Sequence, residues 1–378
     1  MKRAAVRMIA VAILLALSGN ANAHGDGWPF WERYKARFLS TDGRIVDWSA
    51  EECTTSEGEA YALFFALVAN DRASFDLILN WTNEHLAQGG LQKNLPSWIW
   101  KRMPDGAWGI ADMNSASDAD LWIAYTLLQA GHIWHAPIYT SLGRSLADQI
   151  AKEEVVSFHG NHFALLPGRQ GFRPGAQAFY ANPSYEPIQV LTALAKEFPE
   201  GPWRSIAEGV PDQVASSVGH GFALDWVQYR GESGYSAWAG PTSMAQPSGG
   251  YDAIRVYLWA GMLDQQAPQR AAMLNALSGM RTYVLAHSIP PERIAADGTV
   301  ISTTAPVGFS AAVLPFLMAT GEMNAAQIQI DRLERERVNT TGLYGWGQRY
   351  YDQNLILFSQ GWTDGLFHFN ETGQLQLR

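Results

Sequence analysis

Acidic residues stand at the beginning of several apolar segments, where they could support acid–base chemistry. Glu57 precedes the run YALFFALVA, Asp118 and Asp120 precede LWIAYTLLQA, and Asp252 precedes AIRVYLW. Two carboxyl groups can hydrolyse a bond that lies between them, because a protonated one donates to the leaving oxygen while an ionised one activates water. Hydrolysis of a sugar linkage requires such a pair.

The same acids also have a structural interpretation, because Ser, Thr and Asp are favoured at helix starts and the helix dipole favours acids in the first turn. Ser56 with Glu59 fits a capping box, and Ser117 with Asp120 fits a looser version of it. One good cap is enough for each helix. The acid that directly follows each serine is therefore surplus to capping.

This reasoning divides the acids by role. We expect Asp120 to serve the start of its helix and Asp118 to take part in the chemistry. If Asp118 stays ionised close to Glu57, its negative charge would raise the pKa of Glu57, as a general acid requires. Asp252 lies in a third segment and could face these acids across a cleft.

Helical periodicity recurs along the whole chain, whereas the alternation typical of strands is scarce. No low-complexity linker interrupts the pattern, and the loops richest in Gly and Pro lie at 167–184 and 231–250. The spacing predicts helices over 30–38, 57–69, 73–87, 119–131, 139–153, 186–198, 203–217, 252–262, 266–286, 309–319, 324–337 and 350–362.

These helices alternate between two kinds. Segments such as YALFFALVA and FSAAVLPFLM are apolar on all sides, whereas RASFDLILNWTNEHL and AAQIQIDRLERER have one polar face. A helix that is apolar all round must be surrounded by protein, and an amphipathic one faces solvent on one side. The alternation predicts an all-α fold, an (α/α)6 barrel with inner helices inside a ring of outer ones.

This architecture brings every second helix start to one rim of the barrel, because sequential neighbours run antiparallel. The rim would collect carboxyl groups and phenols from five inner helices, while the sixth, in PVGFSAAV, brings no charge. The side chains expected there are Glu57, Asp118, Asp120, Tyr185, Asp252, Tyr350 and Tyr351.

The first 23 residues read as a secretory signal peptide. Positive residues are followed by the short apolar run Met8–Leu17 and by a small-x-small site at Ala21-Asn22-Ala23. The run is too short to span a bilayer. We therefore expect residues 1–23 to be removed and residues 24–378 to form a single catalytic domain, exported and soluble, with no membrane insertion. Cys53 is the only cysteine, and we interpret it as a buried small hydrophobe.

Composition narrows the class of ligand. Removing the signal peptide changes the net charge from −9 to −12, and no long basic run remains, which disfavours nucleic acid and anionic membranes. Fifteen tryptophans and fourteen tyrosines leave two interpretations open, a large aromatic core or a groove lined with flat rings that suits a neutral carbohydrate.

The segment ASDADLWIAYTLLQAGHIW resembles the signature of glycoside hydrolase family 8, A-[ST]-D-[AG]-D followed by Ile/Met-Ala and ending in an aromatic. The match departs at Thr126, where the family usually has Ser or Ala. TTSEGEAYALFFALVANDR, YDAIRVYLW, GFSAAVLPFL and FSQGW further resemble the cellulases encoded with bacterial cellulose synthases. These matches extend from about residue 28 to residue 370.

The resemblance implies an (α/α)6 barrel that cleaves internal β-1,4-glucan bonds with inversion and without a cofactor. By position in the motifs, it implies that Glu57 is the general acid, Asp252 the general base, and Asp118 a contact to the sugar at the cleavage point. Inversion predicts acid and base carboxyls roughly 6.5–9.5 Å apart, leaving room for a water molecule.

The resemblance also suggests residues that bind water and substrate. Tyr185 and Arg255 would hold the attacking water and orient the base, and Arg255 lies at the i,i+3 spacing that lets it meet Asp252. Trp108 and Tyr251 would stack on sugars. The loop before Asp252, MAQPSGGYD, is rich in small residues, and its course is not evident from the sequence.

Other functions stay open at this point. A non-catalytic glycan-binding or scaffolding protein of the secretion machinery would keep the aromatic cleft and lose one acid. A polysaccharide lyase would need basic residues at the rim. Xylan, chitosan and mixed-linkage glucan are alternative substrates within the family. The histidine pairs His132/His135 and His159/His162 lack H-E-x-x-H spacing, which disfavours a catalytic metal. The resemblance favours cellulose, a periplasmic location, and docking on the cellulose synthase and export complex.

Overall fold

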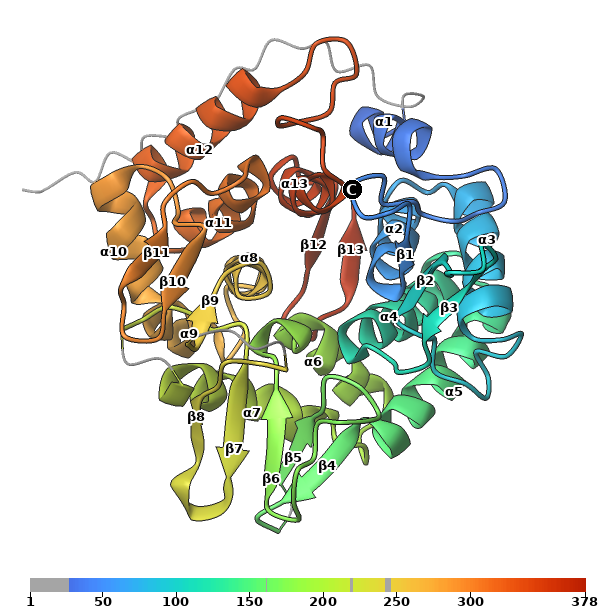
Figure 1. The fold of residues 1–378 in the computed structure, drawn as a ribbon, viewed down its shortest axis with the longest axis horizontal. Coiled ribbons are helices and arrows are strands. Elements are labelled where there is room, and N and C mark those ends of the chain that lie inside the picture. Colours follow the sequence, from blue (N-terminus) through green and yellow to red (C-terminus); the bar gives the residue numbers. More distant parts are fainter. Residues whose placement is uncertain (1–26, 161, 218–219, 242–245) are drawn as a thin grey trace, which may run out of the picture.

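The computed structural model describes residues 27–160, 162–217, 220–241 and 246–378, and Figure 1 shows their arrangement. The segment 1–23, interpreted above as a signal peptide, lies outside these residues. The α-helices are α1 (Pro29–Phe38), α2 (Ser56–Val68), α3 (Arg72–Trp81), α4 (Ser117–Ile133), α5 (Pro137–Glu153), α6 (Ile188–Glu197), α7 (Trp203–Ser217), α8 (Ile254–Gly261), α9 (Arg270–Ala276), α10 (Ser278–His287), α11 (Val307–Ala319), α12 (Met323–Glu336) and α13 (Tyr350–Thr363).

The helices form the expected barrel, with α2, α4, α6, α8, α11 and α13 around the centre and the others outside them (Figure 1). In α2, α4 and α11 nearly every residue is buried, because each is enclosed by neighbours on all sides. The outer helix α12 instead buries only Ala325, Ala326, Gln329 and Leu333. The apolar and amphipathic patterns therefore identified the inner and outer layers, and the (α/α)6 prediction is confirmed.

One predicted helix is divided in the structure. The segment expected to be helical over 266–286 contains α9 and α10, separated at Leu277. The break has a local cause, because Gly279 donates its N–H to the carbonyl of Gly221 (2.9 Å). A β-carbon on Gly279 would lie 2.2 Å from the carbonyl oxygen of His220, so this close approach requires glycine.

Aromatic rings fill the centre of the barrel. Tyr61 of α2, Trp122 of α4, Trp259 of α8 and Phe358 of α13 are all buried, and the Phe358 ring centroid lies 5.0–5.2 Å from those of the other three. These edge-on and tilted contacts are the favoured geometries for buried rings. Much of the aromatic content thus serves the core.

The strands are short and belong to the loops, which explains why alternation was scarce in the sequence. They pair as β1–β2–β3, β4–β5, β6–β7–β8, β9–β10–β11 and β12–β13. Their bounds are β1 (Thr54–Thr55), β2 (Ile99–Arg102), β3 (Trp108–Asp112), β4 (Val155–Phe158), β5 (His162–Leu165), β6 (Ala178–Ala181), β7 (Val227–Arg230), β8 (Tyr235–Ala237), β9 (Ser248–Gly249), β10 (Arg293–Ala295), β11 (Val300–Ser302), β12 (Phe367–Phe369) and β13 (Leu375–Leu377).

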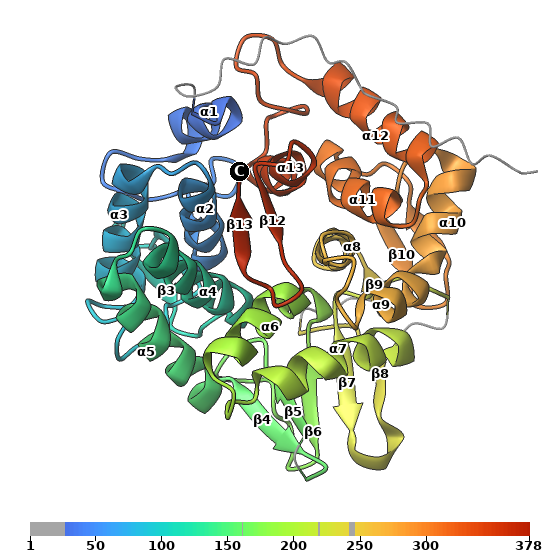
Figure 2. The ribbon, with the colours of Figure 1, turned by 180° about the vertical axis from the view of Figure 1, so that it is seen from behind.

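The C-terminal hairpin β12–β13 crosses the middle of the barrel, as the view from behind shows (Figure 2). Tyr125 of α4 donates its hydroxyl to the carbonyl of Gly373 (2.9 Å), and Gln129 accepts the N–H of Leu375 (3.0 Å). The hairpin is therefore anchored to an inner helix.

Two further expectations concern single features. Cys53 is buried, as expected, and burial raises the pKa of its thiol to about 11. In the described part of the chain, every helix is too short or too polar to cross a membrane.

Candidate active site

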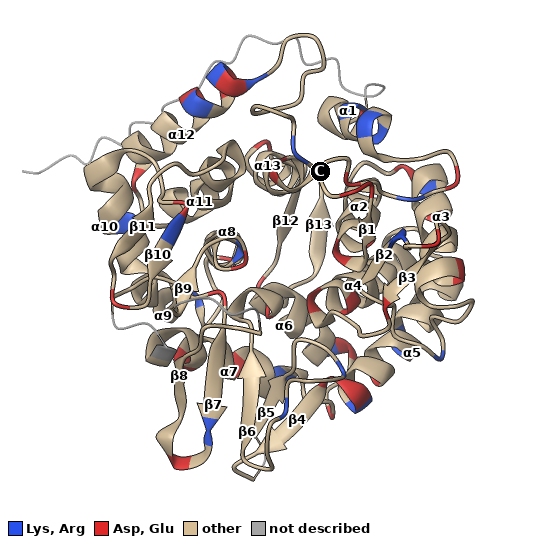
Figure 3. Ribbon diagram, viewed as in Figure 1, with Lys and Arg blue, Asp and Glu red and all other residues tan. Residues whose placement is uncertain are grey.

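The side chain of Arg255 joins acids from separate inner segments. It lies in α8 and is 2% exposed, and its guanidinium forms an ion pair with Glu57 of α2. The same group lies 3.4 Å from Asp118 of α4 and 3.1 Å from Asp252, and it donates to Ser184 (3.0 Å). The expected meeting of helix starts at one rim is therefore observed, and Figure 3 shows acidic and basic segments on α2, α4 and α8 around the barrel centre.

The members of this cluster differ in their access to solvent. The side chains of Glu57 and Asp252 are 19% and 31% exposed, whereas that of Asp118 is 3% exposed. Two carboxyl groups thus face outward, with a buried acid and a buried guanidinium beneath them. Glu57 and Asp252 are therefore the acids of this cluster that solvent can reach.

The start of α2 differs from the predicted capping box. Thr55, not Ser56, is the cap, and its hydroxyl accepts the N–H of Gly58 (3.2 Å). The Glu59 carboxylate instead accepts the N–H of Ile45 (2.7 Å), so it is not available to bond back to the helix start. The cap moved by one residue because Thr54–Thr55 form strand β1, and its extended backbone ends directly at the helix.

The start of α4 also lacks the predicted cap. Ala116 is the N-cap, without a side-chain bond, and Ser117 is already helical. Asp120 lies in the first turn as expected, but its side chain is fully buried. Burial, together with the nearby charge of Glu154, raises the pKa of Asp120 well above its usual range. Its carboxyl group therefore belongs to a buried acid pair and does not cap the helix.

Asp118 is the buried acid of this cluster, and its pKa is raised. Its Oδ1 accepts the N–H of Ala119 (2.9 Å). Burial raises the pKa of Asp118 to about 8, and the charge of Glu57 adds to this, although Arg255 acts in the opposite direction. The raised pKa favours the protonated form of Asp118, whereas the sequence reasoning considered an ionised one.

Asp252 lies just outside the helix predicted to contain it. Helix α8 begins at Ile254, and Asp252 occupies the preceding turn, whose N–H groups bond to a distant side chain. The i,i+3 contact with Arg255 still forms at 3.1 Å. The turn thus brings the Asp252 carboxylate to the Arg255 guanidinium.

Two predicted tyrosines lie beside the cluster. Tyr185 ends the short 3-10 helix Pro183–Tyr185, and its ring centroid lies 5.7 Å from the guanidinium carbon of Arg255. Burial raises the pKa of its phenol well above the usual range, so the hydroxyl stays protonated. Tyr251 donates its hydroxyl to Glu292 (2.9 Å), and its carbonyl accepts the hydroxyl of Tyr351.

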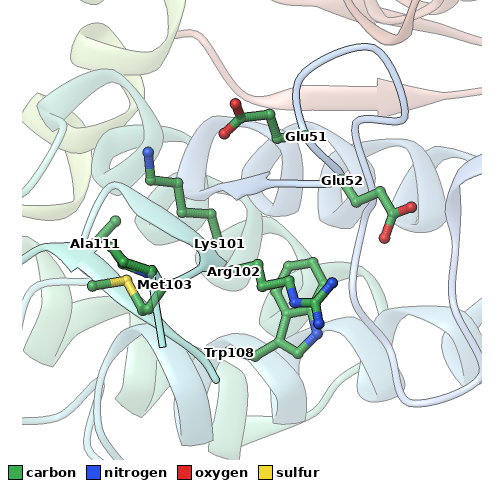
Figure 4. Close-up of a pocket in the computed structure, with 8 residues that line it drawn as sticks. Glu51, Glu52, Lys101, Arg102, Met103, Trp108 and Ala111 are labelled. Carbon is green, nitrogen blue, oxygen red and sulfur yellow. The ribbon is translucent and has the colours of Figure 1, made fainter. Parts of the chain in front are cut away.

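Trp108 occupies a different position from the other predicted residues. It begins β3, is 39% exposed, and packs under the guanidinium of Arg44, whose carbon lies 4.4 Å from the ring. It lines a cavity of about 700 Å³ (Figure 4), and none of the three clustered acids contributes to that lining. The sheet that carries it includes β1, however, which leads directly into α2 and Glu57.

Aromatic residues that the sequence reasoning missed extend from the cluster. The ring of Tyr185 lies 6.3 Å from Trp226, which lies 5.9 Å from Trp238 and stacks at 6.0 Å on Phe172. Tyr180 stacks on Trp238 at 3.8 Å. These four and Tyr185 are all half-buried, so they contribute to the surface of the molecule. The four missed residues come from loops and short strands without periodicity, and the high aromatic content was the only signal of them.

A helical barrel whose rim joins two accessible carboxyl groups to a buried arginine is suited to the enzymes that hydrolyse glycosidic bonds. The model of the family described as glycosyl hydrolases family 8 matches residues 1–365, and the chain belongs to that family. It is therefore a glycoside hydrolase.

Individual relatives agree with this assignment. The chain is 40% identical over 369 residues to a protein named endoglucanase from Xanthomonas axonopodis pv. citri (strain 306), covering 96% of this chain and 92% of the relative. An endoglucanase from Escherichia coli O157:H7 is 40% identical over 351 residues, covering 92% of this chain and 90% of the relative. The solved structure of endo-1,4-D-glucanase from Vibrio fischeri ES114 aligns with a TM-score of 0.81 and 37% identity, over 93% of this chain and 99% of that one.

Proposed function

We propose that the protein is an endo-β-1,4-glucanase that hydrolyses internal bonds of cellulose chains with inversion. The observation that carries this proposal is the convergence of Glu57, Asp118 and Asp252 on the Arg255 guanidinium, with two of the three carboxyl groups open to solvent. The endoglucanase names of relatives that match nearly the whole chain support β-1,4-glucan as the substrate.

Each acid has a defined part in this mechanism. Glu57 donates its proton to the glycosidic oxygen, and the bond between that oxygen and the anomeric carbon breaks. Asp252 takes a proton from a water molecule, whose oxygen attacks the anomeric carbon from the opposite face. The exposure of both side chains at the rim supports these roles.

The other clustered residues hold the reactants in place. Asp118 accepts or donates a hydrogen bond at the sugar where cleavage occurs, a role that a buried, protonated carboxyl can fill. Arg255 orients the Asp252 carboxylate, as their 3.1 Å contact suggests, and Tyr185 helps to hold the attacking water. Because Arg255 is almost fully buried, water screens its interactions with these groups only weakly.

The aromatic residues around the cluster would bind the glucan. Rings at the surface offer flat apolar faces for sugars, and the neighbouring rings of Tyr185, Trp226 and Trp238 begin beside Arg255. Tyr251 and Trp108 are further stacking candidates. Several sugar sites on both sides of the acids would favour cutting within a chain.

The proposal is tested with carboxymethylcellulose, lichenan, xylan and chitosan, following viscosity and reducing ends together. We expect carboxymethylcellulose to lose viscosity much faster than reducing ends accumulate, which indicates internal cutting. Faster hydrolysis of xylan or chitosan would identify that polymer as the substrate in place of cellulose. The absence of new reducing ends on every polymer would favour a glycan-binding protein.

We also propose that the protein is exported to the periplasm and accompanies cellulose synthesis, docking on the synthase and export complex. The signal-peptide pattern of residues 1–23 supports export, and the resemblance to cellulases of cellulose synthase operons supports the rest. Cell fractionation with mass spectrometry of the mature protein is the test. We expect a periplasmic form beginning at His24, and a full-length cytoplasmic form would contradict export.

A further inference from the structure

The turn that carries Asp252 is held by an acid from a distant part of the chain. Asp225, just before β7, is 9% exposed. Its Oδ1 accepts three backbone N–H groups of the turn, from Gly250 (2.8 Å), Asp252 (3.2 Å) and Ala253 (2.8 Å). One oxygen atom therefore fixes the backbone on both sides of Asp252 and at Asp252 itself.

These bonds shape the turn that leads into α8. The first helical residues, Ile254, Arg255 and Val256, donate their N–H groups to carbonyls of that turn at 3.0–3.1 Å. The N–H groups of the turn itself are the ones that Asp225 accepts. A carboxylate close to a helix start also benefits from the helix dipole. Asp225 therefore stabilises the backbone ahead of α8, although it is 27 residues away from Asp252 along the chain.

The second oxygen of Asp225 is also fixed. Its Oδ2 lies 3.4 Å from the Arg293 guanidinium, which donates to the hydroxyl of Ser248 (3.0 Å). The N–H of Asp225 bonds to the carbonyl of Ser248 (3.0 Å). A β-carbon on Gly249 would lie 2.0 Å from the carbonyl oxygen of Ala223, so the two segments touch backbone to backbone. The carboxylate thus has little freedom to move.

Asp225 also interacts electrostatically with Asp252. Burial and the neighbouring charge of Asp252 raise the pKa of Asp225 to about 6, while its backbone bonds and Arg293 act in the opposite direction. At neutral pH the carboxylate is therefore ionised. Each of its three hydrogen bonds then involves a full charge, which makes them stronger than bonds between neutral groups.

We infer that Asp225 is a positioning residue for hydrolysis, which folds the 250–253 turn around one carboxylate oxygen and so aims Asp252 at the attacking water. This inference rests on the proposed role of Asp252 as general base. Asp225 itself does not contact the glucan. Its effect is geometric, and small displacements of a reacting group lower turnover strongly, by about 100-fold for a shift of about 1 Å.

The test is a double-mutant cycle with cellopentaose. Asp225→Ala alone is expected to lower kcat by roughly 10- to 100-fold while KM changes less than about twofold. In the Asp252→Asn background, Asp225→Ala is expected to lower kcat by less than about twofold more, because no base remains to be aimed. Equal losses of kcat in both backgrounds, or near-normal kcat in the single Asp225→Ala variant, would overturn the inference.

A matched control separates positioning from folding. Asp352 is also buried and accepts the N–H of Gly308 (3.0 Å) near the start of α11, the inner helix whose first turn has no acid. Asp352→Ala is expected to lower the melting temperature but to leave kcat within about threefold. If it lowers kcat as much as Asp225→Ala does, Asp225 has only a structural role.

Two further outcomes keep the test decisive. Asp225→Asn keeps one acceptor oxygen at nearly the same shape, and we expect a folded protein whose kcat lies between those of the wild type and Asp225→Ala. A folded Asp225→Asn protein that matches the wild type would contradict the need for charge at this position. Near-normal kcat in Asp252→Asn would instead refute the proposed general base, which is a separate failure.

Discussion

Replacing Gly58 by alanine should displace Glu57, the general acid of the proposed mechanism. Gly58 follows Glu57 in the first turn of α2, and a β-carbon there would lie 2.2 Å from the Tyr350 hydroxyl oxygen and 3.0 Å from Cζ. Ordinary van der Waals contact begins at 3.4 Å, so the phenol or the helix start must move by about 1 Å. The Tyr350 ring cannot move freely, because it is 6% exposed and packs edge-on against Phe38.

The size of the effect follows from two opposing terms. Overpacking a dense core costs about 1–3 kcal/mol, whereas alanine is better than glycine in a helix by up to about 1 kcal/mol. We expect Gly58→Ala to lower the free energy of unfolding by about 1–2 kcal/mol. Because Glu57 is the adjacent residue, kcat should fall by roughly 10- to 100-fold with a smaller change in KM.

Gly209 provides a matched control within another helix. Among the residues that the structure describes, a β-carbon on Gly209 of α7 would meet no atom within 4 Å, so Gly209→Ala should raise the free energy of unfolding by about 0.5–1 kcal/mol. Urea unfolding and steady-state kinetics on cellopentaose measure both variants. If Gly58→Ala is as stable and active as Gly209→Ala, the packing argument is refuted.

Three further predictions concern other parts of the molecule. Glu57→Gln and Asp252→Asn should each lower kcat by at least about 1,000-fold with an unchanged circular dichroism spectrum, and near-normal turnover in either would remove that residue from the mechanism. Burial raises the pKa of Glu186 from 4.5 to about 8, so the folded protein holds this proton more tightly than the unfolded chain, and stability falls as pH rises between those values. Relative to Glu186→Gln, the wild type should therefore lose up to about 4 kcal/mol of unfolding free energy from pH 4.5 to 8, measured by urea unfolding, and a constant difference would contradict the raised pKa. Trp226→Ala should raise KM for cellohexaose at least about fivefold with a smaller change in kcat, and an unchanged KM would exclude this ring from the glucan site.

The layers of the fold were predictable because each inner helix is enclosed on all sides. That environment requires apolar residues at nearly every position, and α2, α4 and α11 have them. The meeting of helix starts at one rim then followed from the antiparallel order. The shared contacts of Glu57, Asp118 and Asp252 with one guanidinium needed coordinates, because they depend on the rotation of each helix.

Other features depend on contacts between distant segments, which local patterns do not reveal. The turn at Asp252 is shaped by Asp225, and the pKa of Asp118 depends on how completely its surroundings exclude water. The predicted cap of α2 was wrong for a more local reason. A two-residue strand ahead of α2 moved the N-cap from the expected Ser56 to Thr55. The roles proposed for Tyr185 and Trp108 came from the family resemblance and not from periodicity.

The stereochemistry of the first product tests the proposed mechanism most directly. Hydrolysis of cellopentaose can be followed by proton NMR during the first minutes, before the anomers of the products equilibrate. Direct attack by water activated by Asp252, with protonation by Glu57, predicts that the newly formed reducing end is the α-anomer. If the β-anomer forms first, a covalent intermediate is required, and the assignment of Asp252 as a general base is contradicted.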